Sequence, residues 1–353
     1  MKRDGGILKF AKTDTLEGYF EALDERIDEI LPARVSLLAH IAGYTLRLIF
    51  PSIEYTRYVV SDMFVSPDNG RSVDATFIWW EDRIFPYRLH SFTHSKGFEQ
   101  LSPNFCKMED NYGYVEIVGD TLRAADYQKD VYYLLTYPIL QEIKWAVVGH
   151  PFVKSVFMWA QRRNLLLLHS AAVGIDGHGV LIVGHGGTGK STLTCTCLAD
   201  GFDFVSDDYC LLTATGSRIV YPIYTNVLLN QDSLAKLPMF KPFEILPKQG
   251  EKPTFIVGEA GIKQSLAVEA IILPQITDRT EPEIKPDKTS KALGQVVFST
   301  VKQLGRFHET EFVRKLSQRL LGMPVYRFSL TKDLDKNCQY LKKWIQEDLS
   351  CTN

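Results

Sequence analysis

The sequence lacks the features by which nucleic-acid-binding and membrane-spanning proteins are most readily recognised. Its 353 residues carry a formal net charge of −2, and no basic stripe with interleaved aromatic residues occurs, so no general electrostatic attraction to nucleic acid or to an anionic membrane is expected. No apolar run reaches the ~18 residues of a transmembrane helix, and no apolar signal region follows the basic start at Met1-Lys2-Arg3. These absences predict a cytoplasmic protein with neither a nucleic-acid nor a membrane partner.

Cysteines in metal-binding pairs are also missing. Cys195 and Cys197 lie two residues apart on a predicted helix, so their side chains face different directions. The remaining cysteines are too far apart in sequence to form a paired ligand motif, and the six in total stand at positions 106, 195, 197, 210, 338 and 351. We therefore expect reduced thiols, as in the cytoplasm.

Composition and hydrophobic pattern indicate two domains. With 45% hydrophobic and 23% charged residues, the chain is ordinary for a globular protein of this size. An apolar stripe predicts a helix over 14–31, and β-branched or aromatic runs predict strands at 44–50, 55–60, 73–80 and 113–118. Helices are predicted at 129–147 and 151–162. We expect a small α+β domain over 1–125 and a catalytic domain over 126–353.

One stretch carries the strongest chemical signal. Residues 184–192 match the phosphate-binding pattern G-x-x-x-x-G-K-[ST] at every fixed position. Glycines in such a loop permit positive φ angles and turn backbone N–H groups toward phosphate oxygens. Lys190 would contact the β- and γ-phosphates, and Ser191 would ligate Mg²⁺. The residues predicted to bind a nucleoside triphosphate are Gly184, His185, Gly186, Gly187, Thr188, Gly189, Lys190, Ser191 and Thr192.

The residues on either side of this loop fit the same function. The apolar run 179–184 is typical of a buried strand, and 191–200 is typical of a helix that ends at Gly201. Strand, glycine loop and helix therefore follow in the required order, and the helix directs its positive dipole end toward the bound anion. The alternative is a merely flexible glycine turn.

Two adjacent carboxylates follow one helix later. The next predicted strand, 201–206, ends at Asp207 and Asp208. Parallel strands joined by a crossover helix end at the same sheet edge, so both acids should lie beside the phosphates. One carboxylate, for which we choose Asp208, would hold Mg²⁺, and the other would accept the proton of an attacking hydroxyl. An ordinary turn after a strand is the alternative.

These residues resemble a known family. The segments Leu168-His-Ser-Ala-Ala-Val173, the glycine loop and Gly201-Phe-Asp-Phe-Val-Ser-Asp-Asp208 are similar to the catalytic domain of HPr kinase/phosphorylase and to its diverse bacterial relatives. The resemblance is tight over 168–212 and loose beyond. It implies an α/β P-loop fold similar to phosphoenolpyruvate carboxykinase, ATP and Mg²⁺ as cofactors, and catalytic roles for Lys190, Asp207 and Asp208, with Asp207 preferred as the base.

The sequence also departs from that family. The arginine-containing segment that follows the acid pair in HPr kinase/phosphorylase is not visible, since Arg218 is the single arginine between 201 and 278. Neither HPr as a substrate nor a reverse phosphorylase reaction is therefore expected. The resemblance implies a histidine before the loop, and His169 fits; its role is either catalytic or structural. His185 either reaches phosphate or fills a variable position.

The C-terminal part offers fewer chemical signals. A hairpin is predicted over 209–224, and Asn226–Leu237 is predicted to be helical. Lys241, Lys248 and Lys252 lie in a Pro- and Lys-rich loop that would either approach an anionic substrate or remain a solvated loop. Further strands are predicted at 267–273 and 325–330, and helices at 308–321 and 334–349.

Other nucleotide-using classes fit poorly. The sequence has no signature of ABC-type ATPases, and Thr331-Lys332 is followed by an acid one residue too late for a guanine-binding motif. A dinucleotide-binding loop would need glycine or alanine where Lys190-Ser191 stands. We expect an ATP-dependent, Mg²⁺-requiring kinase that acts on a hydroxyl of a peptide or a small molecule, and a homo-oligomer is compatible with the sequence. The rivals are an ATP-binding regulatory protein without phosphotransfer and a carboxykinase-like enzyme.

Overall fold

The chain forms two compact units. The computed structural model describes residues 15–30, 34–60, 63–81, 99–102, 105–118, 121–136, 149–240, 253–304 and 308–349. One unit comprises Met1–Val60 and Val65–Ser155, and the other comprises Ser61–Phe64 and Val156–Asn353. This division lies further along the chain than the predicted boundary at 125, because the strands that cover 121–136 still pair into the sheet of the first unit.

The first unit is built on a mixed nine-stranded sheet of order β3-β1-β2-β4-β9-β8-β7-β6-β5. Most neighbouring strands are antiparallel, but β4 pairs parallel with both β2 and β9. The strands are β1 (Val35–Ile41), β2 (Tyr44–Phe50), β3 (Val65–Pro67), β4 (Ala75–Glu81), β5 (Glu99–Ser102), β6 (Phe105–Glu109), β7 (Gly113–Val118), β8 (Thr121–Asp126) and β9 (Val131–Thr136). The predicted strands at 44–50, 73–80 and 113–118 are confirmed.

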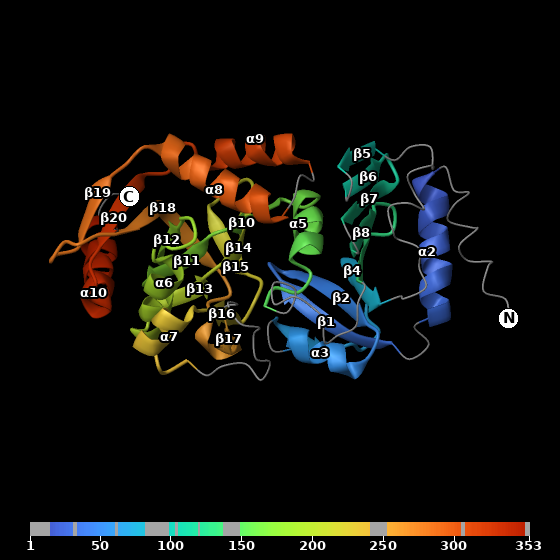
Figure 1. Ribbon diagram of the computed structural model, residues 1–353, viewed down its shortest axis with the longest axis horizontal. Helices are drawn as coiled ribbons and strands as arrows, with labels where there is room; N and C mark the ends of the chain where they lie inside the picture. Colours follow the sequence, from blue (N-terminus) through green and yellow to red (C-terminus); the bar gives the residue numbers. More distant parts are fainter. Residues whose placement is uncertain are drawn as a thin grey trace. The chain divides into compact units, whose positions relative to one another are not determined.

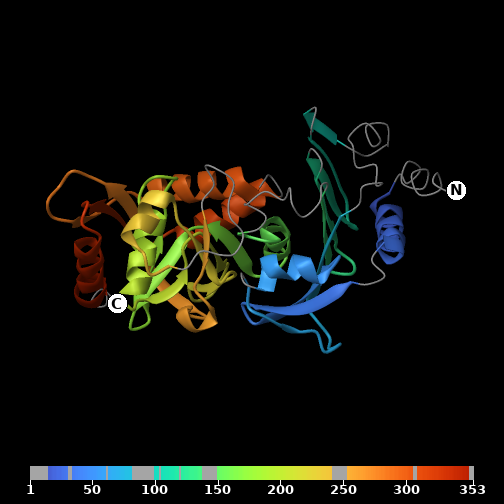
Figure 2. The same cartoon turned by 60° about the horizontal axis from the view of Figure 1, so that its bottom comes forward.

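Helix α2 (Leu16–Ile30) covers one face of strands β6–β8 (Figures 1 and 2). Its apolar stripe, read from the sequence, is the buried face: Leu16, Tyr19 and Leu23 are at most 2% exposed. They pack with apolar residues of the sheet that include Val115, Ile117 and Leu122. The helix predicted over 14–31 is therefore confirmed within the part that the structure describes, and the hydrophobic effect holds it to the sheet.

Two predicted elements of the first unit are wrong. Residues 55–60 are not a strand but part of helix α3 (Ile53–Val60), in which Tyr55 packs against Trp79 with ring centroids 5.3 Å apart. Residues 131–136 are not helical but form β9, which lies between β4 and β8. A strand in the middle of a sheet covered on both faces shows no alternation of polar and apolar residues. Its sequence pattern therefore does not distinguish it from a buried helix. The rest of that predicted helix, 137–147, lies outside the described residues.

Asp68 gives the first unit a pH-dependent contribution to stability. The Ser36 hydroxyl donates to Asp68 Oδ2 at 2.6 Å, Arg47 Nε at 2.8 Å and the Gly70 amide to Oδ1 at 2.9 Å. These hydrogen bonds, led by that of Ser36, lower the pKa of Asp68 from 3.8 to about 2. Since the folded-state pKa is depressed, the stabilisation is present above about pH 4 and is lost as the pH falls toward 2.

We expect Asp68→Asn to lower the free energy of unfolding by about 2 kcal/mol at pH 7, which corresponds to the pKa shift. The difference from wild type should shrink as the pH approaches 2. Urea unfolding at several pH values measures both effects. Asp28→Asn is the matched control, because Asp28 is 70% exposed in its pair with Arg34 and such surface pairs contribute little. An equal loss at pH 2.5 and pH 7 would contradict the expectation.

The second unit contains a further mixed sheet, of order β10-β14-β15-β18-β12-β11-β13, with β20 paired to β18 and β19 to β20. Its strands are β10 (Leu165–His169), β11 (Ala171–Ile175), β12 (His178–Ile182), β13 (Asp203–Ser206), β14 (Tyr209–Thr213), β15 (Ile219–Pro222), β18 (Leu266–Ile276), β19 (Glu283–Pro286) and β20 (Val325–Leu330). A two-stranded sheet joins β16 (Asn226–Leu228) to β17 (Thr254–Ile256). With two large mixed sheets and helices packed against them, the chain is a mixed α/β protein, as predicted at that level.

Helices pack against this second sheet (Figure 1). Helix α6 packs against β11, α10 against α6, and α8 against both β10 and α9. The helices are α5 (Val153–Gln161), at which the two units divide, α6 (Lys190–Ala199), α7 (Gln231–Lys236), α8 (Thr289–Leu304), α9 (Glu309–Leu320) and α10 (Leu334–Trp344), with the short turns η3 (Glu259–Gly261) and η4 (Ile345–Leu349). None of the helices within the described ranges is long and apolar enough to cross a membrane.

The predictions for this unit hold with one exception. The hairpin of β14 and β15 is antiparallel as expected, and α5, β18, α9, β20 and α10 lie where the pattern predicts them. Asn226–Leu237, predicted as a helix, begins as strand β16 instead, and its helical part is limited to α7. The hydrogen bonds that Asn226–Leu228 form with β17 account for the difference.

Cysteine side chains contribute to both apolar cores. Cys106 packs in the core of the first unit, and Cys195, Cys197 and Cys338 in that of the second. All cysteines within the described ranges, which also include Cys210, are buried and reduced. Cys197 of α6 and Cys338 of α10 lie with their Sγ atoms 3.8 Å apart. In these positions the thiols act as small apolar side chains between helices.

Close approach of two strands makes Gly179 of β12 essential for the second unit. A Cβ atom there would lie 2.4 Å from the carbonyl oxygen of Ala267 on β18. We expect Gly179→Ala to lower the free energy of unfolding by about 3 kcal/mol, because the clash is with backbone. Gly294→Ala on α8 is the matched control, since nothing lies within 4 Å of that Cβ. The control should raise the free energy of unfolding by about 0.5–1 kcal/mol. If both variants shifted the melting temperature in the same direction, the close packing at Gly179 would be contradicted.

Candidate functional site

The glycine-rich loop joins β12 to α6, in the strand, loop and helix order predicted from the sequence. Strand β12 ends at Ile182, and α6 begins at Lys190. Gly187 and Gly189 have φ angles of 87° and 96°, a backbone conformation that other residues rarely adopt. Residues 185–187 are exposed. The loop therefore presents its central residues to solvent immediately before the N-terminus of a helix.

Gly184 and Gly186 do not have the positive φ angles expected of them. Gly184 is instead required by close packing, since a Cβ atom there would lie 2.4 Å from Thr188 Oγ1. The Thr188 hydroxyl donates to the His185 carbonyl oxygen at 2.9 Å and so closes the loop on itself. Thr192 lies 2.6 Å, oxygen to oxygen, from the hydroxyl of Ser233, which ties the first turn of α6 to α7.

The acid pair lies at the end of β13, as predicted. Strands β12 and β13 both pair antiparallel with β11, so they run in the same direction with β11 between them. Their carboxyl ends therefore meet the same edge of the sheet, which places Asp207 and Asp208 beside the start of α6. The Ser206 hydroxyl stabilises the turn, because it accepts from the Asp208 amide at 3.1 Å and donates to the Tyr209 carbonyl at 2.7 Å.

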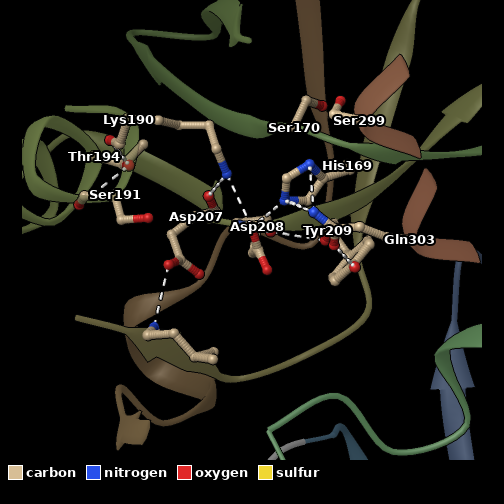
Figure 3. Close-up of polar contacts among 12 residues, drawn as sticks. His169, Ser170, Lys190, Ser191, Thr194, Asp207, Asp208, Tyr209, Ser299 and Gln303 are labelled. Atoms are coloured by element: carbon tan, nitrogen blue, oxygen red, sulfur yellow. Dashed lines mark hydrogen bonds and ion pairs between the residues drawn. The ribbon is translucent and has the colours of Figure 1, made fainter. Parts of the chain in front are cut away.

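Lys190 and Asp208 form the centre of the site (Figure 3). The ammonium group of Lys190 donates to Asp208 Oδ1 at 3.0 Å and to the Asp207 carbonyl oxygen at 2.8 Å. His169 Nε2 lies 2.7 Å from the same Oδ1 of Asp208. The four residues predicted to be catalytic, His169, Lys190, Asp207 and Asp208, are thus brought together from β10, α6 and the β13–β14 turn.

The two acids have different surroundings. Asp207 is 2% exposed, and its Oδ2 accepts the backbone N–H of Leu228 at 3.2 Å. The side chain of Asp208 is 20% exposed. Two carboxylates next to one ammonium group give a negative balance at this sheet edge, which a divalent cation would neutralise.

Two further residues complete the site and were not predicted. Tyr209 is the strand partner of His169 across β10 and β14, and Gln303 reaches the site from α8. The Tyr209 hydroxyl donates to Gln303 Oε1, and Gln303 Nε2 lies 3.3 Å from His169 Nδ1. Burial, together with the charge of Asp208, raises the pKa of the Tyr209 phenol well above 10.0. Tyr209 is therefore a protonated hydrogen-bond donor at neutral pH.

The remaining predicted residues are not part of this cluster. His185 lies against the exposed ring of Phe298 on α8, with ring centroids 5.4 Å apart. Ser191 follows Lys190 on the first turn of α6, and its carbonyl oxygen accepts from the Thr194 hydroxyl at 3.4 Å. Lys241, Lys248 and Lys252 lie outside the described residues.

The donor set suits a magnesium nucleotide. Oxygen ligands from Ser191 and the acid pair are the kind that Mg²⁺ takes, and Mg²⁺ commonly uses one or two protein carboxylates together with substrate phosphates. Accordingly, a protein-only metal cluster is not required, and within the described ranges no three His, Cys, Asp or Glu side chains form one. The exposed residues 185–187 and the N-terminus of α6 suit phosphate oxygens.

Comparisons with known proteins identify distant similarity. The family model described as SynChlorMet cassette protein ScmC matches residues 140–236, which include the glycine loop and the acid pair. Among solved structures, the HPr(Ser) kinase/phosphatase from Coxiella burnetii is similar, with 16% identity over 53% of this chain and 91% of that chain and a TM-score of 0.28. No curated protein matches this sequence. The structural match is distant.

Proposed function

We propose that this protein is an ATP-dependent, Mg²⁺-requiring kinase that transfers a phosphoryl group to a hydroxyl. The observation that supports this most is the contact of Lys190, at the end of a glycine loop, with Asp208. In our proposal this lysine binds the phosphates and this carboxylate accepts the proton, and their direct contact supports the two acting on the same reacting group. Phosphoryl transfer needs mainly such positioning and electrostatic stabilisation.

In this proposal each residue has a distinct role. The amides of residues 185–187 and of Gly189 and the Lys190 ammonium hold the phosphates, and Ser191 and Asp207 hold Mg²⁺. Bound ATP would supply the phosphoryl group, and Mg²⁺ held by these residues would neutralise charge on the phosphates. As the acceptor oxygen bonds to the γ-phosphorus, the bond to the β-phosphate oxygen breaks, ADP leaves, and the hydroxyl proton passes to Asp208.

The assignment of the base differs from the sequence-based preference for Asp207. A base must be accessible to the acceptor, and Asp207 is enclosed and held by the Leu228 amide. Asp208 is the more exposed of the two and faces His169. We therefore exchange the roles, with Asp208 as base and Asp207 as metal ligand.

Transfer of labelled γ-phosphate from ATP tests the proposal. The full chain is incubated with Mg²⁺ and pooled acceptors that include free serine, polyols and serine-containing peptides. We expect labelled product with the wild type and with Lys263→Met, a control at an exposed lysine that pairs with Asp203, but not with Lys190→Met. Tight ATP binding without product from any pool would instead favour an ATP-binding regulatory protein, and product on a carboxylate would favour a carboxykinase-like enzyme.

A further inference from the structure

The carboxyl ends of β18 and β20 lie on the side of the glycine loop away from the acid pair. In the sheet, β11 and β13 lie on one side of β12, and β18 with β20 beyond it lies on the other (Figure 1). Strands β12, β18 and β20 are parallel, so all three end at the edge that carries the loop. Ile182, the last residue of β12, pairs with Ile272, whereas Ile276 still pairs with Leu330 of β20. Residues 273–276 of β18 therefore extend past the end of β12.

Two apolar side chains from these strand ends pack against the glycine loop. A Cβ atom at Gly189 would lie 2.9 Å from Leu330 Cδ1 and 3.3 Å from Ile276 Cγ1. Leu330 is 4% exposed and belongs to the apolar core of the second unit. Ile276 is 54% exposed. Ile276 therefore presents an apolar surface to solvent directly beside the residue that precedes Lys190.

Hydrogen bonds hold both strand ends in place. Thr277, which follows Ile276, donates from its amide and from its hydroxyl to the Leu330 carbonyl oxygen, each at 2.9 Å. After β20, the Thr331 amide donates to Asn337 Oδ1 at 2.9 Å, and Asn337 Nδ2 donates to the Thr331 carbonyl oxygen at 3.0 Å. The surface around Ile276 is therefore preorganised, and a ligand that binds there does not have to order it.

The direction of a bound triphosphate determines which part of the nucleotide reaches this surface. In the proposed function, the γ-phosphate lies beside Asp208, on the β13 side of the loop. The phosphate chain then crosses the loop, and the nucleoside leaves it on the side of β18. Ligands of open α/β sheets bind outside the carboxyl ends of the strands. A nucleobase is flat and largely apolar on its faces, so it gains free energy when it buries an aliphatic side chain.

We propose that the base of the bound nucleoside triphosphate packs on Ile276, between the glycine loop and the turn that begins at Thr331. This inference rests on the proposed function and assigns the second half of the same ligand. Burial of Ile276 by the base supplies affinity that the phosphates alone do not supply. The contact lies on the opposite side of Lys190 from the acid pair, so it adds to binding of the nucleotide without entering the transfer step.

Phe298 on α8 is a competing apolar surface beside the loop. It is 55% exposed and lies against the ring of His185. Helix α8, however, lies on the acid-pair side, because its Thr300 hydroxyl accepts from the backbone N–H of His169 at 3.0 Å. A base on Phe298 would therefore occupy the side from which the acceptor has to approach Asp208. The geometry favours Ile276 for the base.

Binding of ATP and of inorganic triphosphate, each with Mg²⁺ and measured by calorimetry on the full chain, separates the base from the phosphates. We expect Ile276→Ser to weaken ATP binding by about 10-fold, as the loss of roughly half a buried isoleucine predicts. Binding of inorganic triphosphate should change less than about twofold. Leu321→Ser is the matched control, because Leu321 is 72% exposed at the end of α9; it should alter neither affinity. Phe298→Ser should also leave the ATP affinity unchanged.

A photoreactive azido group on the base of ATP locates the contact directly. We expect the cross-linked peptides to contain residues 274–278 or 331–333. An unchanged ATP affinity in Ile276→Ser, equal weakening of both ligands, or cross-links confined to α8 would overturn this inference while phosphotransfer persists. Absence of ATP binding to the wild type would overturn the proposed function, and this inference with it.

Discussion

Lys190→Met is expected to lower kcat/KM for phosphotransfer by about 10³-fold, the range found when one preorganised charge at a transferring phosphoryl group is removed. The Lys190 side chain is 7% exposed, and methionine keeps an apolar chain in this buried position while it removes the ammonium group. ATP binding should weaken as well, because the same group contacts the phosphates before transfer. Initial rates with labelled ATP and equilibrium binding by calorimetry measure both effects.

The stability of this variant should change little. Removing one partner of a buried ion pair is costly when the other charge is left alone, but Asp208 retains the contact with His169 and is partly exposed. We therefore expect a loss of about 1 kcal/mol or less in urea unfolding. Lys263→Met is the control for both measurements. A Lys190→Met variant with wild-type transfer rates would remove the basis for the phosphate-binding role of the loop.

Asp208→Asn should separate binding from transfer. Asparagine preserves the shape of the side chain, yet it is a poor proton acceptor, so we expect kcat to fall by about 10²- to 10⁴-fold, the usual contribution of general acid–base catalysis. The Kd for ATP should stay the same or decrease, because Lys190 no longer pairs with a carboxylate and interacts more strongly with phosphate. Single-turnover kinetics and ATP titration on the same preparation give the two quantities.

Two further aspartates make this prediction specific. Asp203→Asn, at the far end of the same strand β13, removes an ion pair with Lys263 and should leave kcat unchanged. Asp207→Asn should chiefly raise the Mg²⁺ concentration required for half-maximal rate. If Asp207→Asn abolished transfer at saturating Mg²⁺ while Asp208→Asn retained most of kcat, the proton acceptor would be Asp207, as the sequence resemblance implies.

Local sequence patterns predict those parts of the fold that local interactions determine. The strand, loop and helix around Lys190 follow from glycine positions and apolar runs, and α2 follows from its stripe. The pattern fails where neighbouring strands decide the structure. The apolar residues of β9 are compatible with a helix until β4 and β8 cover both its edges, and Asn226–Leu228 extends only because β17 pairs with it.

The candidate site shows the same limit. Lys190 is predicted from the glycine-loop motif, and Asp207 and Asp208 from a crossover connection that brings strand ends together. His169 is predicted only from the family resemblance. Gln303 reaches His169 across a separation of 134 residues, and nothing in the residues near it distinguishes it from any other helical glutamine. The sequence does not predict the contact of the Tyr209 hydroxyl with Gln303 either, since the position of Tyr209 indicates only a strand residue. Long-range side-chain contacts of this kind become visible only in three dimensions.

The buried cysteines make local unfolding of each unit measurable through the rate at which a thiol reagent labels them. A thiol reagent can reach Cys106 only when the first unit opens, and it can reach Cys195, Cys197, Cys210 and Cys338 only when the second does. Labelling rates at these positions, resolved by mass spectrometry of peptides, therefore report the opening free energy of each unit separately within one intact chain. A nucleotide that binds the second unit should slow labelling at Cys195 and Cys197 on α6 while leaving Cys106 unaffected.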